Sequence, residues 1–486
     1  MQKQVYLFLL MIACTFLNGQ SIDRKQKNVL YVIADDLSSI INSYNDGGVI
    51  TPNLDKLAAN GVVFEKAYCQ SSLCNPSRTS IMTGKYPAET RVLGNQPHFR
   101  GVDPSVKTIP QYFKEQGYYS VGIGKIYHNW GQAIKGDERS WSEPEIYHWG
   151  AHFMDWYIPG RPYELHTDIK KRGAVQCEDV PDEAYLDGRV ANAAVNKLRE
   201  LREVPFFMAV GFWKPHLPYN APKKYWDLYD RENLPGVKYD SPVNNLPEWV
   251  YVNSNEARSY TDVHRLDDIS EEKKAELRHG YLASISYMDA QFGKIYQELE
   301  RLDLLNSTII VFVSDHGYHA GEHGQFGKWT NFEIGAKVPL ILSSPGLIEK
   351  GARVDEVVEL IDLFPSLIDL CDVEKTNYFK KLSGTSFKSI LLDKKTTVKN
   401  TAVTQIQRPI GSEESFKVLG SSIRSDNFRY NVWTDRYTNT IIAEELYDLS
   451  MDVMKVENVA HLAKYQAIKR EHLKLLNDKL NSNFKE

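Results

Sequence analysis

Two continuous apolar runs, each followed within two residues by an acidic residue, constrain the fold of this chain more than any other feature. The first run, Asn28 to Ala34, leads into Asp35 and Asp36, and the second, Thr308 to Val313, is followed closely by Asp315. An apolar run without polar interruptions is typical of a strand that is buried on both faces of a parallel sheet. We therefore expect a parallel sheet that carries carboxylates at the ends of two of its strands.

Helical patterns separate these strands along the chain. A third apolar run covers Pro205 to Gly211, and the segments with helical patterns are Asn53 to Asn60, Thr108 to Gln116, Leu186 to Arg202 and Ile269 to Leu302. Strands that alternate with helices indicate an α/β domain with a large, mostly parallel mixed sheet flanked by helices. Ligands of such sheets bind beyond the carboxyl ends of the strands, where both acidic clusters are expected.

The composition of the chain changes after residue 372. Alternating segments at Ser421 to Trp433 and a basic helical pattern at Ala463 to Asn481 follow a polar, lysine-rich stretch. This pattern predicts a smaller α+β subdomain with an antiparallel sheet. We expect a catalytic domain over residues 20–372 and a C-terminal subdomain over residues 373–486.

The first residues have the pattern of an export signal. Lys3 supplies positive charge, and Val5 to Leu17 is an apolar segment too short to span a bilayer after processing. We expect a signal peptide over residues 1–19 and a mature protein that begins at Gln20, in the periplasm or outside the cell. Lipid anchoring at Cys14 is the weaker alternative, because the residues before it match a lipobox poorly. No later segment has the pattern of a transmembrane helix.

The acidic residues at the two strand ends predict a metal site. Adjacent carboxylates such as Asp35 and Asp36 repel each other unless a cation or a proton lies between them. Taken alone, this pair could equally be a solvated turn or a helix cap. Together with Asp315 it brings three carboxylates from two strand ends, which suits calcium first and magnesium second.

The run from Cys74 to Gly84, CNPSRTSIMTG, places a cysteine at the start of a predicted helix. Pro76 and Ser77 are residues that open helices, and the exposed N–H groups of a helix start favour an anion. Arg78 follows four residues after the cysteine, so it faces the same side of the helix and can hold a negative charge there.

This run, together with the preceding Asp35 and Asp36, closely resembles the signature of type I sulfatases, and in particular their iduronate 2-sulfatase branch. The resemblance extends from about Asn28 to Asp452. It implies the alkaline-phosphatase-like sulfatase fold and the hydrolysis of sulfate esters. It also implies that a maturation enzyme oxidises Cys74 to formylglycine, whose hydrate attacks sulfur with one hydroxyl and expels sulfate with the other.

The resemblance further assigns roles to single residues. The implied metal ligands are Asp35, Asp36, Cys74, Asp315 and His316. Lys125 and Lys328 are implied to bind sulfate oxygens, and His128 to take the proton of the nucleophile. His216, in the motif Lys-Pro-His, is the expected donor of a proton to the leaving oxygen.

The resemblance implies a 2-O-sulfate on a uronic acid or xylose residue as the substrate, within algal ulvan or, alternatively, a glycosaminoglycan. Insertions at residues 137–181 and 215–266 are expected to form loops that enclose the pocket, which favours exo action on short oligosaccharides. Aromatic residues from Trp141 to Tyr163 are candidates for stacking on sugar rings. Arg408 either meets a substrate carboxylate or is a solvated loop residue, and His323 either joins the site or orients its loop.

Composition excludes some classes of partner and leaves others open. The formal charge of −5 over 486 residues gives no basic footprint for nucleic acid, so positive charge should gather locally around an anionic substrate. The cysteine spacing suggests neither a zinc site nor a disulfide framework. A phosphonate or phosphodiester hydrolase of the same superfamily remains an alternative, as does a non-catalytic glycan-binding protein in which Cys74 stays unmodified.

Overall fold

The computed structural model describes residues 26–482 apart from 45–47, 149–171, 238, 244, 253, 264–268, 345, 347, 393–396, 409–416 and 451–456. The predicted signal peptide and Cys14 therefore lie outside the described residues. Residues 149–163, which belong to the aromatic segment from Trp141 to Tyr163, lie outside them as well. Within the described part of the chain, no helix is both long and apolar enough to cross a membrane.

A seven-stranded mixed sheet forms the centre of the larger part of the molecule, with the strand order β11-β2-β10-β7-β1-β5-β3. Its strands are β1 (Asn28–Asp35), β2 (Val62–Tyr68), β3 (Tyr119–Gly124), β5 (Phe206–Pro215), β7 (Thr308–Ser314), β10 (Leu340–Ser343) and β11 (Ala352–Glu359). Only β10 runs antiparallel to its neighbours β2 and β7, and the remaining pairs of neighbours are parallel. The predicted mostly parallel sheet is confirmed.

Helices cover both faces of this sheet. One layer contains α2 (Pro52–Ala59), α7 (Leu186–Leu201) and α9 (Glu271–Arg301), and the other contains α3 (Cys74–Thr83), α6 (Ile109–Glu115), α11 (Leu363–Leu370) and α12 (Lys388–Leu392). The predicted helices differ from these bounds by at most two residues at an end. Shorter elements complete this part: α4 (Pro87–Thr90), α5 (Phe99–Val102), α8 (Lys223–Trp226), α10 (Glu333–Ala336), β4 (Val175–Glu178), β6 (Tyr219–Pro222), β8 (His319–Ala320) and β9 (Phe326–Gly327).

The apolar run of β1 explains why this strand lies at the centre of the sheet. Successive side chains of a strand point to opposite faces. Leu30 and Val32 accordingly pack in the core under α2, α7 and α9, whereas Val29, Tyr31 and Ile33 pack in the core under α3 and α6. All of these side chains are fully buried, so a polar residue at any of them would lie in one of the two cores.

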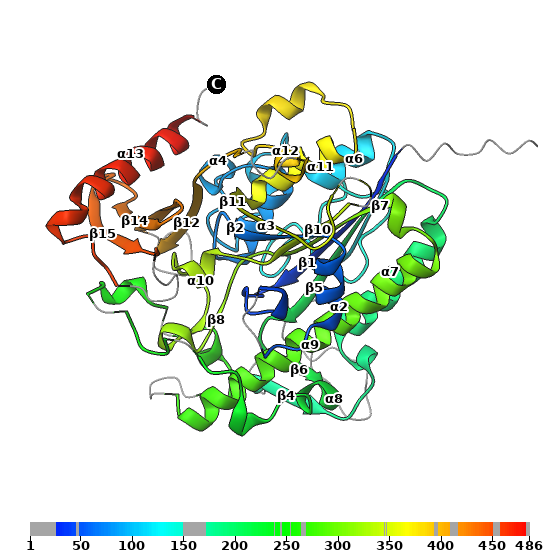
Figure 1. Cartoon of the computed structure of the whole chain (residues 1–486), viewed down its shortest axis with the longest axis horizontal. Coiled ribbons are helices and arrows are strands. Elements are labelled where there is room, and N and C mark those ends of the chain that lie inside the picture. Colours follow the sequence, from blue (N-terminus) through cyan, green and yellow to red (C-terminus); the bar gives the residue numbers. More distant parts are fainter. Residues whose placement is uncertain are drawn as a thin grey trace, which may run out of the picture.

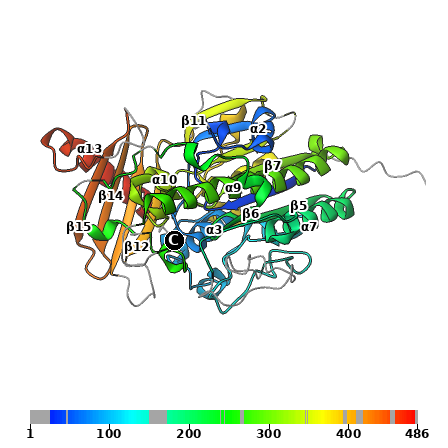
Figure 2. The same ribbon diagram turned by 90° about the horizontal axis from the view of Figure 1, so that it is seen from below.

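The C-terminal strands form a separate antiparallel sheet, which Figure 1 and Figure 2 show in orange beside the larger sheet. It contains β12 (Ala402–Arg408), β13 (Val418–Arg424), β14 (Phe428–Asp435) and β15 (Ile441–Asp448), paired in that order, and α13 (Gln466–Ser482) packs against it. The predicted α+β subdomain is present, while its boundary at residue 373 stays a prediction.

A buried carboxylate joins the two sheets. Glu333 of α10 accepts hydrogen bonds from Arg424 of β13 at 3.1 Å, from Arg429 of β14 at 2.6 Å and from the hydroxyl of Tyr68 in β2 at 2.7 Å. Burial opposes the charge of this carboxylate, but the two guanidinium groups lower the pKa of Glu333 to about 2. Its ion pairs therefore stabilise the fold fully above the ordinary pKa of 4.5, and this contribution is lost as the pH falls through about 2.

We expect Glu333→Gln to lower the free energy of unfolding by about 3–5 kcal/mol, because it leaves two buried guanidinium groups without their counter-ion. Urea unfolding followed by tryptophan fluorescence measures this change. Glu300→Gln is the matched control, because the ion pair of Glu300 with Lys56 lies at the surface and contributes about 1 kcal/mol or less. Equal stability of the two variants would contradict the role of Glu333 as the link between the sheets.

Candidate active site

The ends of β1 and β7 bring the predicted carboxylates together. The two strands are parallel neighbours, with Ala34 opposite Ser314, so the residues that follow them meet at one edge of the sheet. The backbone N–H of Asp36 donates to a carboxylate oxygen of Asp315 at 3.3 Å. Asp36 has a positive φ of 64°, which turns the chain sharply at the end of β1.

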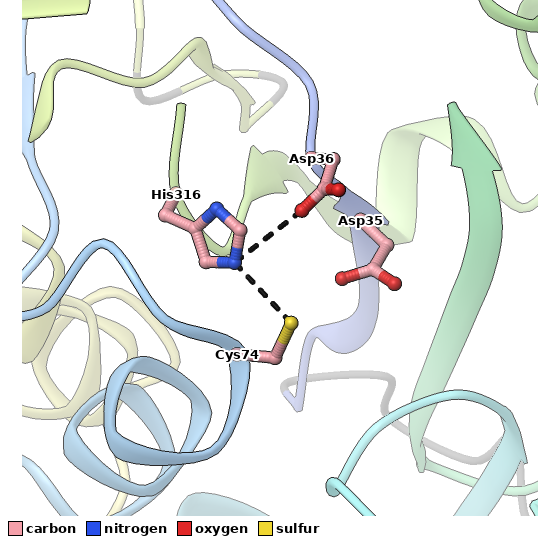
Figure 3. Close-up of side chains that lie close together, drawn as sticks. All are labelled: Asp35, Asp36, Cys74 and His316. Carbon is pink, nitrogen blue, oxygen red and sulfur yellow. Dashed lines mark hydrogen bonds and ion pairs between the residues drawn. The ribbon is translucent and has the colours of Figure 1, made fainter. Parts of the chain in front are cut away.

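Cys74 faces these carboxylates from the start of α3. Figure 3 shows its sulfur pointing toward His316, whose Nε2 lies 3.3 Å from Sγ and 3.5 Å from a carboxylate oxygen of Asp36. Asp35, Asp36, Cys74 and His316 each offer one ligand atom, and these atoms lie within 4.8 Å of one another. All four side chains are buried, so they can form a coordination site shielded from bulk water.

Arg78 and Lys125 neutralise the carboxylates on one side of the site. Arg78 donates from Nε to Asp315 at 2.8 Å, and its Nη2 lies 3.3 Å from Asp35. The ammonium group of Lys125 donates to the other oxygen of Asp35. Arg78, predicted to follow Cys74 on the same side of the helix, therefore lies between the cysteine helix and the strand ends.

Lys328 and His216 contact the neighbouring carboxylate, that of Asp36. Lys328 Nζ donates to the two carboxylate oxygens of Asp36 at 2.8 and 2.9 Å, and His216 Nε2 lies 3.6 Å from the same carboxylate. Glu256, which the sequence analysis did not single out, contacts both cations: His216 Nε2 at 2.9 Å and Lys328 Nζ at 3.3 Å. Burial opposes the charge of Glu256, but Lys328 and His216 lower its pKa to about 2.

The charges around Cys74 favour a nucleophile or an anion at this position. Burial opposes ionisation of the thiol, yet Lys125 and Lys328 hold the pKa of Cys74 well below its ordinary value. His128 lies near the cysteine; burial lowers the pKa of its ring, and the neighbouring sulfur opposes that effect. Neither ring nitrogen of His128 has a hydrogen-bond partner among the described residues. A neutral imidazole beside residue 74 can accept a proton.

The carboxylates, in contrast, carry more negative charge than this buried site readily stabilises. Burial raises the pKa of Asp315 to about 7 even though Arg78 opposes the change. Burial likewise raises the pKa of Asp36, against the effects of His216 and Lys328. A cation between these groups would stabilise their ionised forms, so their chemistry fits a metal ion with oxygen ligands.

The end of β5 holds His216 in position through Asp187, which carried no signal in the sequence, and through Lys214 of the Lys-Pro-His motif. The carboxylate of Asp187, in α7, accepts hydrogen bonds from the backbone N–H groups of Trp213 and Lys214 at 2.8 and 2.9 Å. The ammonium group of Lys214 donates to the carbonyl of Pro218 at 2.9 Å. These bonds fix the backbone on both sides of His216.

Two expectations for the surroundings of the site need correction. Arg408 is a buried residue of β12 that donates to the backbone carbonyls of Trp249 and Val250 at 3.1 Å, so it is not a solvated loop residue and is not directed to a substrate. Trp141 is buried against Gly122 in the core and offers no exposed ring for a sugar. These positions were misassigned because aromatic and cationic residues at loops and strand ends have the same sequence pattern whether buried or exposed.

The contacts of His323 bear on the two alternatives left open for this residue. Its ring packs against His319 and Phe332, with ring centres 5.3 and 5.0 Å apart. His319 is held by the hydroxyl of Thr330 at 2.8 Å, and burial lowers its pKa to about 3. These contacts support the loop-orienting alternative for His323, because they place its ring in the packing of the 319–332 segment.

The chain matches known proteins over nearly all of its length. The family model described as Sulfatase covers residues 27–373, and the model described as N-sulphoglucosamine sulphohydrolase, C-terminal covers residues 321–482. Iduronate 2-sulfatase of Mus musculus is 30% identical over 89% of this chain and 90% of that protein. A sulfatase of Formosa agariphila is 30% identical over 98% of this chain and 92% of that protein. The solved structure of BT1596, a 2-O GAG sulfatase, has a TM-score of 0.71 at 21% identity, over 94% of this chain and 92% of that one.

Proposed function

The chain belongs to the sulfatase family and is a sulfuric ester hydrolase, and we propose that it removes a 2-O-sulfate group from a uronic acid or xylose residue of a sulfated polysaccharide or its oligosaccharides. The observation that carries this proposal is the meeting of Cys74, the strand-end carboxylates and two lysines in one buried site. The sequence similarity to an iduronate 2-sulfatase supports the position of the sulfate group on the sugar.

We propose that calcium, or less favourably magnesium, binds to Asp35, Asp36, residue 74, Asp315 and His316. The charges support a divalent ion together with a sulfate ester. The four carboxylates of the site, which include Glu256, face Arg78, the two lysines and the cationic form of His216. A divalent cation would offset the repulsion among Asp35, Asp36 and Asp315, and a sulfate ester would bring the negative charge that the lysines and His216 can hold. When bound, the cation would lower the pKa of an attacking hydroxyl and stabilise negative charge on sulfate.

We propose that Cys74 is converted by a maturation enzyme to formylglycine, whose hydrate supplies the nucleophilic hydroxyl. The start of α3 suits this role, because unpaired N–H groups at a helix start favour negative charge. Cys74 is only 1% exposed, so a substrate has to enter the site for its sulfate group to reach this residue. That depth supports exo action on short oligosaccharides over action within long chains.

The remaining residues bind sulfate and move protons in this proposal. Lys125 pairs with Asp35 and Lys328 with Asp36, and each would hold a sulfate oxygen, so that charge developing on these oxygens meets fixed cations. His128 would take a proton from the group at residue 74. His216 would give a proton from Nε2 to the leaving sugar oxygen as the S–O bond breaks. The oxygen of the attacking hydroxyl would leave with sulfate when the second hydroxyl reforms the aldehyde, and water would then rehydrate that aldehyde.

The proposal also covers the polysaccharide that supplies the substrate and the location of the protein. Ulvan is the favoured polysaccharide, and heparan or dermatan sulfate is the alternative, which the similarity to the structure of a 2-O GAG sulfatase supports. The segment of residues 1–19 would direct the chain to the periplasm or the medium, with lipid anchoring at Cys14 as the weaker alternative.

Sulfate release from defined glycans tests this function. The matured protein is incubated with desalted ulvan oligosaccharides, heparin oligosaccharides and a 6-O-sulfated hexosamine, and free sulfate is followed by ion chromatography. We expect release from a 2-O-sulfated uronic acid or xylose residue at the end of a short chain. Turnover of the 6-O-sulfated hexosamine alone would show that the proposed position is wrong.

A panel of an aryl sulfate and a phenylphosphonate monoester separates the proposed activity from that of a phosphonate hydrolase. We expect the aryl sulfate to react faster, and a dominant rate with the phosphonate would refute the sulfatase assignment of this site. Heat-treated protein is the blank for both substrates. Tight glycan binding with no turnover of any substrate would favour the non-catalytic alternative.

A further inference from the structure

Glu256 contacts both proposed substrate-binding cations without belonging to the proposed metal ligands. One carboxylate oxygen lies 2.9 Å from Nε2 of His216, and the other lies 3.3 Å from Nζ of Lys328. The other ring nitrogen of His216 bonds to the carbonyl of Leu217 at 2.6 Å. The ring therefore faces an oxygen on each side, and the side chain of Glu256 is only 17% exposed.

The segment that carries Glu256 is attached to the segment that carries Lys328. The N–H of Val252 donates to the side-chain oxygen of Gln325 at 3.1 Å. The N–H of Phe326 donates to the hydroxyl of Ser254 at 2.8 Å. Both bonds are buried and lie within four residues of Glu256 or Lys328, so the contact between these two side chains is built into the local fold.

Asp36 could not keep all of its present contacts with Lys328 and His216 if its carboxylate bound a cation. Its two carboxylate oxygens accept bonds from Lys328, and one of them also lies near His216. A metal ion would occupy lone pairs of the same oxygens and repel both cationic side chains. Glu256, which is not among the proposed calcium ligands, would then offer Lys328 and His216 a carboxylate.

We propose that Glu256 is a positioning residue, which keeps Lys328 and His216 on the substrate side of the site when Asp36 binds the metal ion. The inference rests on the proposed function, because it takes calcium as the ion and sulfate as the ligand of Lys328. It adds a residue that acts on the reaction through its two neighbours and not through contact with the reacting atoms.

A double-mutant cycle on calcium affinity tests this role without using turnover. Calcium is titrated by calorimetry into the wild type, Glu256→Ala, Lys328→Met and the double variant. We expect Glu256→Ala to weaken calcium binding by about 5-fold or more, because Lys328 then stays on Asp36. In the Lys328→Met background, the same change should have an effect of less than about 2-fold.

The cycle separates failure of this inference from failure of the proposed function. Equal effects of Glu256→Ala in both backgrounds would show that Glu256 acts only through its charge, and would overturn the positioning role alone. A wild-type protein that binds no calcium would overturn the metal site and, with it, this role. Sulfate release from glycans remains an independent measure of the proposed function in either case.

Leaving-group dependence supplies the second test. We expect Glu256→Ala to lower kcat/KM for a sugar sulfate by about 100-fold, because His216 loses its alignment with the leaving oxygen. In Glu256→Gln, kcat/KM for the sugar sulfate should fall by only about 10-fold, since the amide oxygen can still accept a bond from His216. For an activated aryl sulfate, whose phenolate leaves without a proton, kcat/KM should fall by less than about 10-fold in either variant.

Glu271→Gln is the matched control for both tests, because Glu271 is exposed and pairs only with Lys274 among the ion pairs of the described residues. We expect this variant to match the wild type. If Glu256→Ala slows the sugar and aryl sulfates equally and also lowers the melting temperature, its role is structural and the inference is wrong.

Discussion

Cys74→Ala is expected to abolish sulfate release while leaving the fold intact. The expected loss is about 10⁴-fold or more, because removal of a covalent nucleophile leaves only the binding and electrostatic parts of catalysis. Alanine is compatible with the first turn of α3, and the substitution removes a single buried sulfur. The free energy of unfolding should therefore fall by no more than about 1–2 kcal/mol. Ion chromatography of released sulfate and urea unfolding measure the two effects.

Cys371→Ala is the matched control, because Cys371 is also buried but lies in the core near Tyr118, away from the strand ends. It should keep full activity at a similar cost in stability. Cys74→Ser should be nearly as inactive as Cys74→Ala unless the maturation enzyme accepts serine. Retained activity of Cys74→Ala would refute covalent catalysis by residue 74.

Mass spectrometry of the tryptic peptide Ala67–Arg78 tests the modification itself. This peptide contains Cys69 as well as Cys74, so fragmentation is needed to assign the change to one of them. We expect an aldehyde at position 74 and an unmodified thiol at position 69, because Cys74 begins the run CNPSR that resembles the sulfatase signature, whereas Cys69 is followed by Gln-Ser-Ser. A peptide with two unmodified thiols from a turnover-competent preparation would exclude formylglycine.

Much of the fold could be predicted because its strands are buried on both faces. The run from Asn28 to Ala34 has no polar residue after its first position, and this pattern is typical of a central strand in a sheet covered by helices on both sides. The two acidic clusters were predicted to meet because parallel strands carry their carboxyl ends to one edge. The structure places Asp35 and Asp315 there, on either side of Arg78.

What the sequence did not predict depends on contacts between distant segments. Glu256 lies in a polar stretch whose composition resembles that of a solvated loop, and the bonds of its neighbours to Gln325 and Phe326 attach this stretch to the site. Arg408 ends a strand whose residues are all buried, so its guanidinium bonds to the carbonyls of a neighbouring loop. Periodicity reports which face of an element is buried, but it does not report which loop covers that face.

Asp315→Asn is expected to remove most of the bound calcium and nearly all activity. The substitution keeps the shape of the side chain but removes one of the negative charges that attract a divalent ion. It also weakens the bond to Arg78, which donates to Asp315 at 2.8 Å, and so loosens a cation of the site. Bound metal is measured by atomic emission after gel filtration, and activity by sulfate release.

The control and the chelation experiment determine whether this loss reflects the metal ion. Asp355→Asn removes a carboxylate that is 78% exposed and pairs with Lys66 at the surface, so it should change neither the calcium content nor the rate. Chelation of the wild type should reproduce the defect of Asp315→Asn, and added calcium should restore the wild type but not the variant. If instead the variant or the chelated wild type stays fully active, the carboxylates at the ends of β1 and β7 do not hold a catalytic metal ion. Their charge would then be balanced by Arg78, Lys125 and Lys328 alone, as in the contacts that these side chains make here.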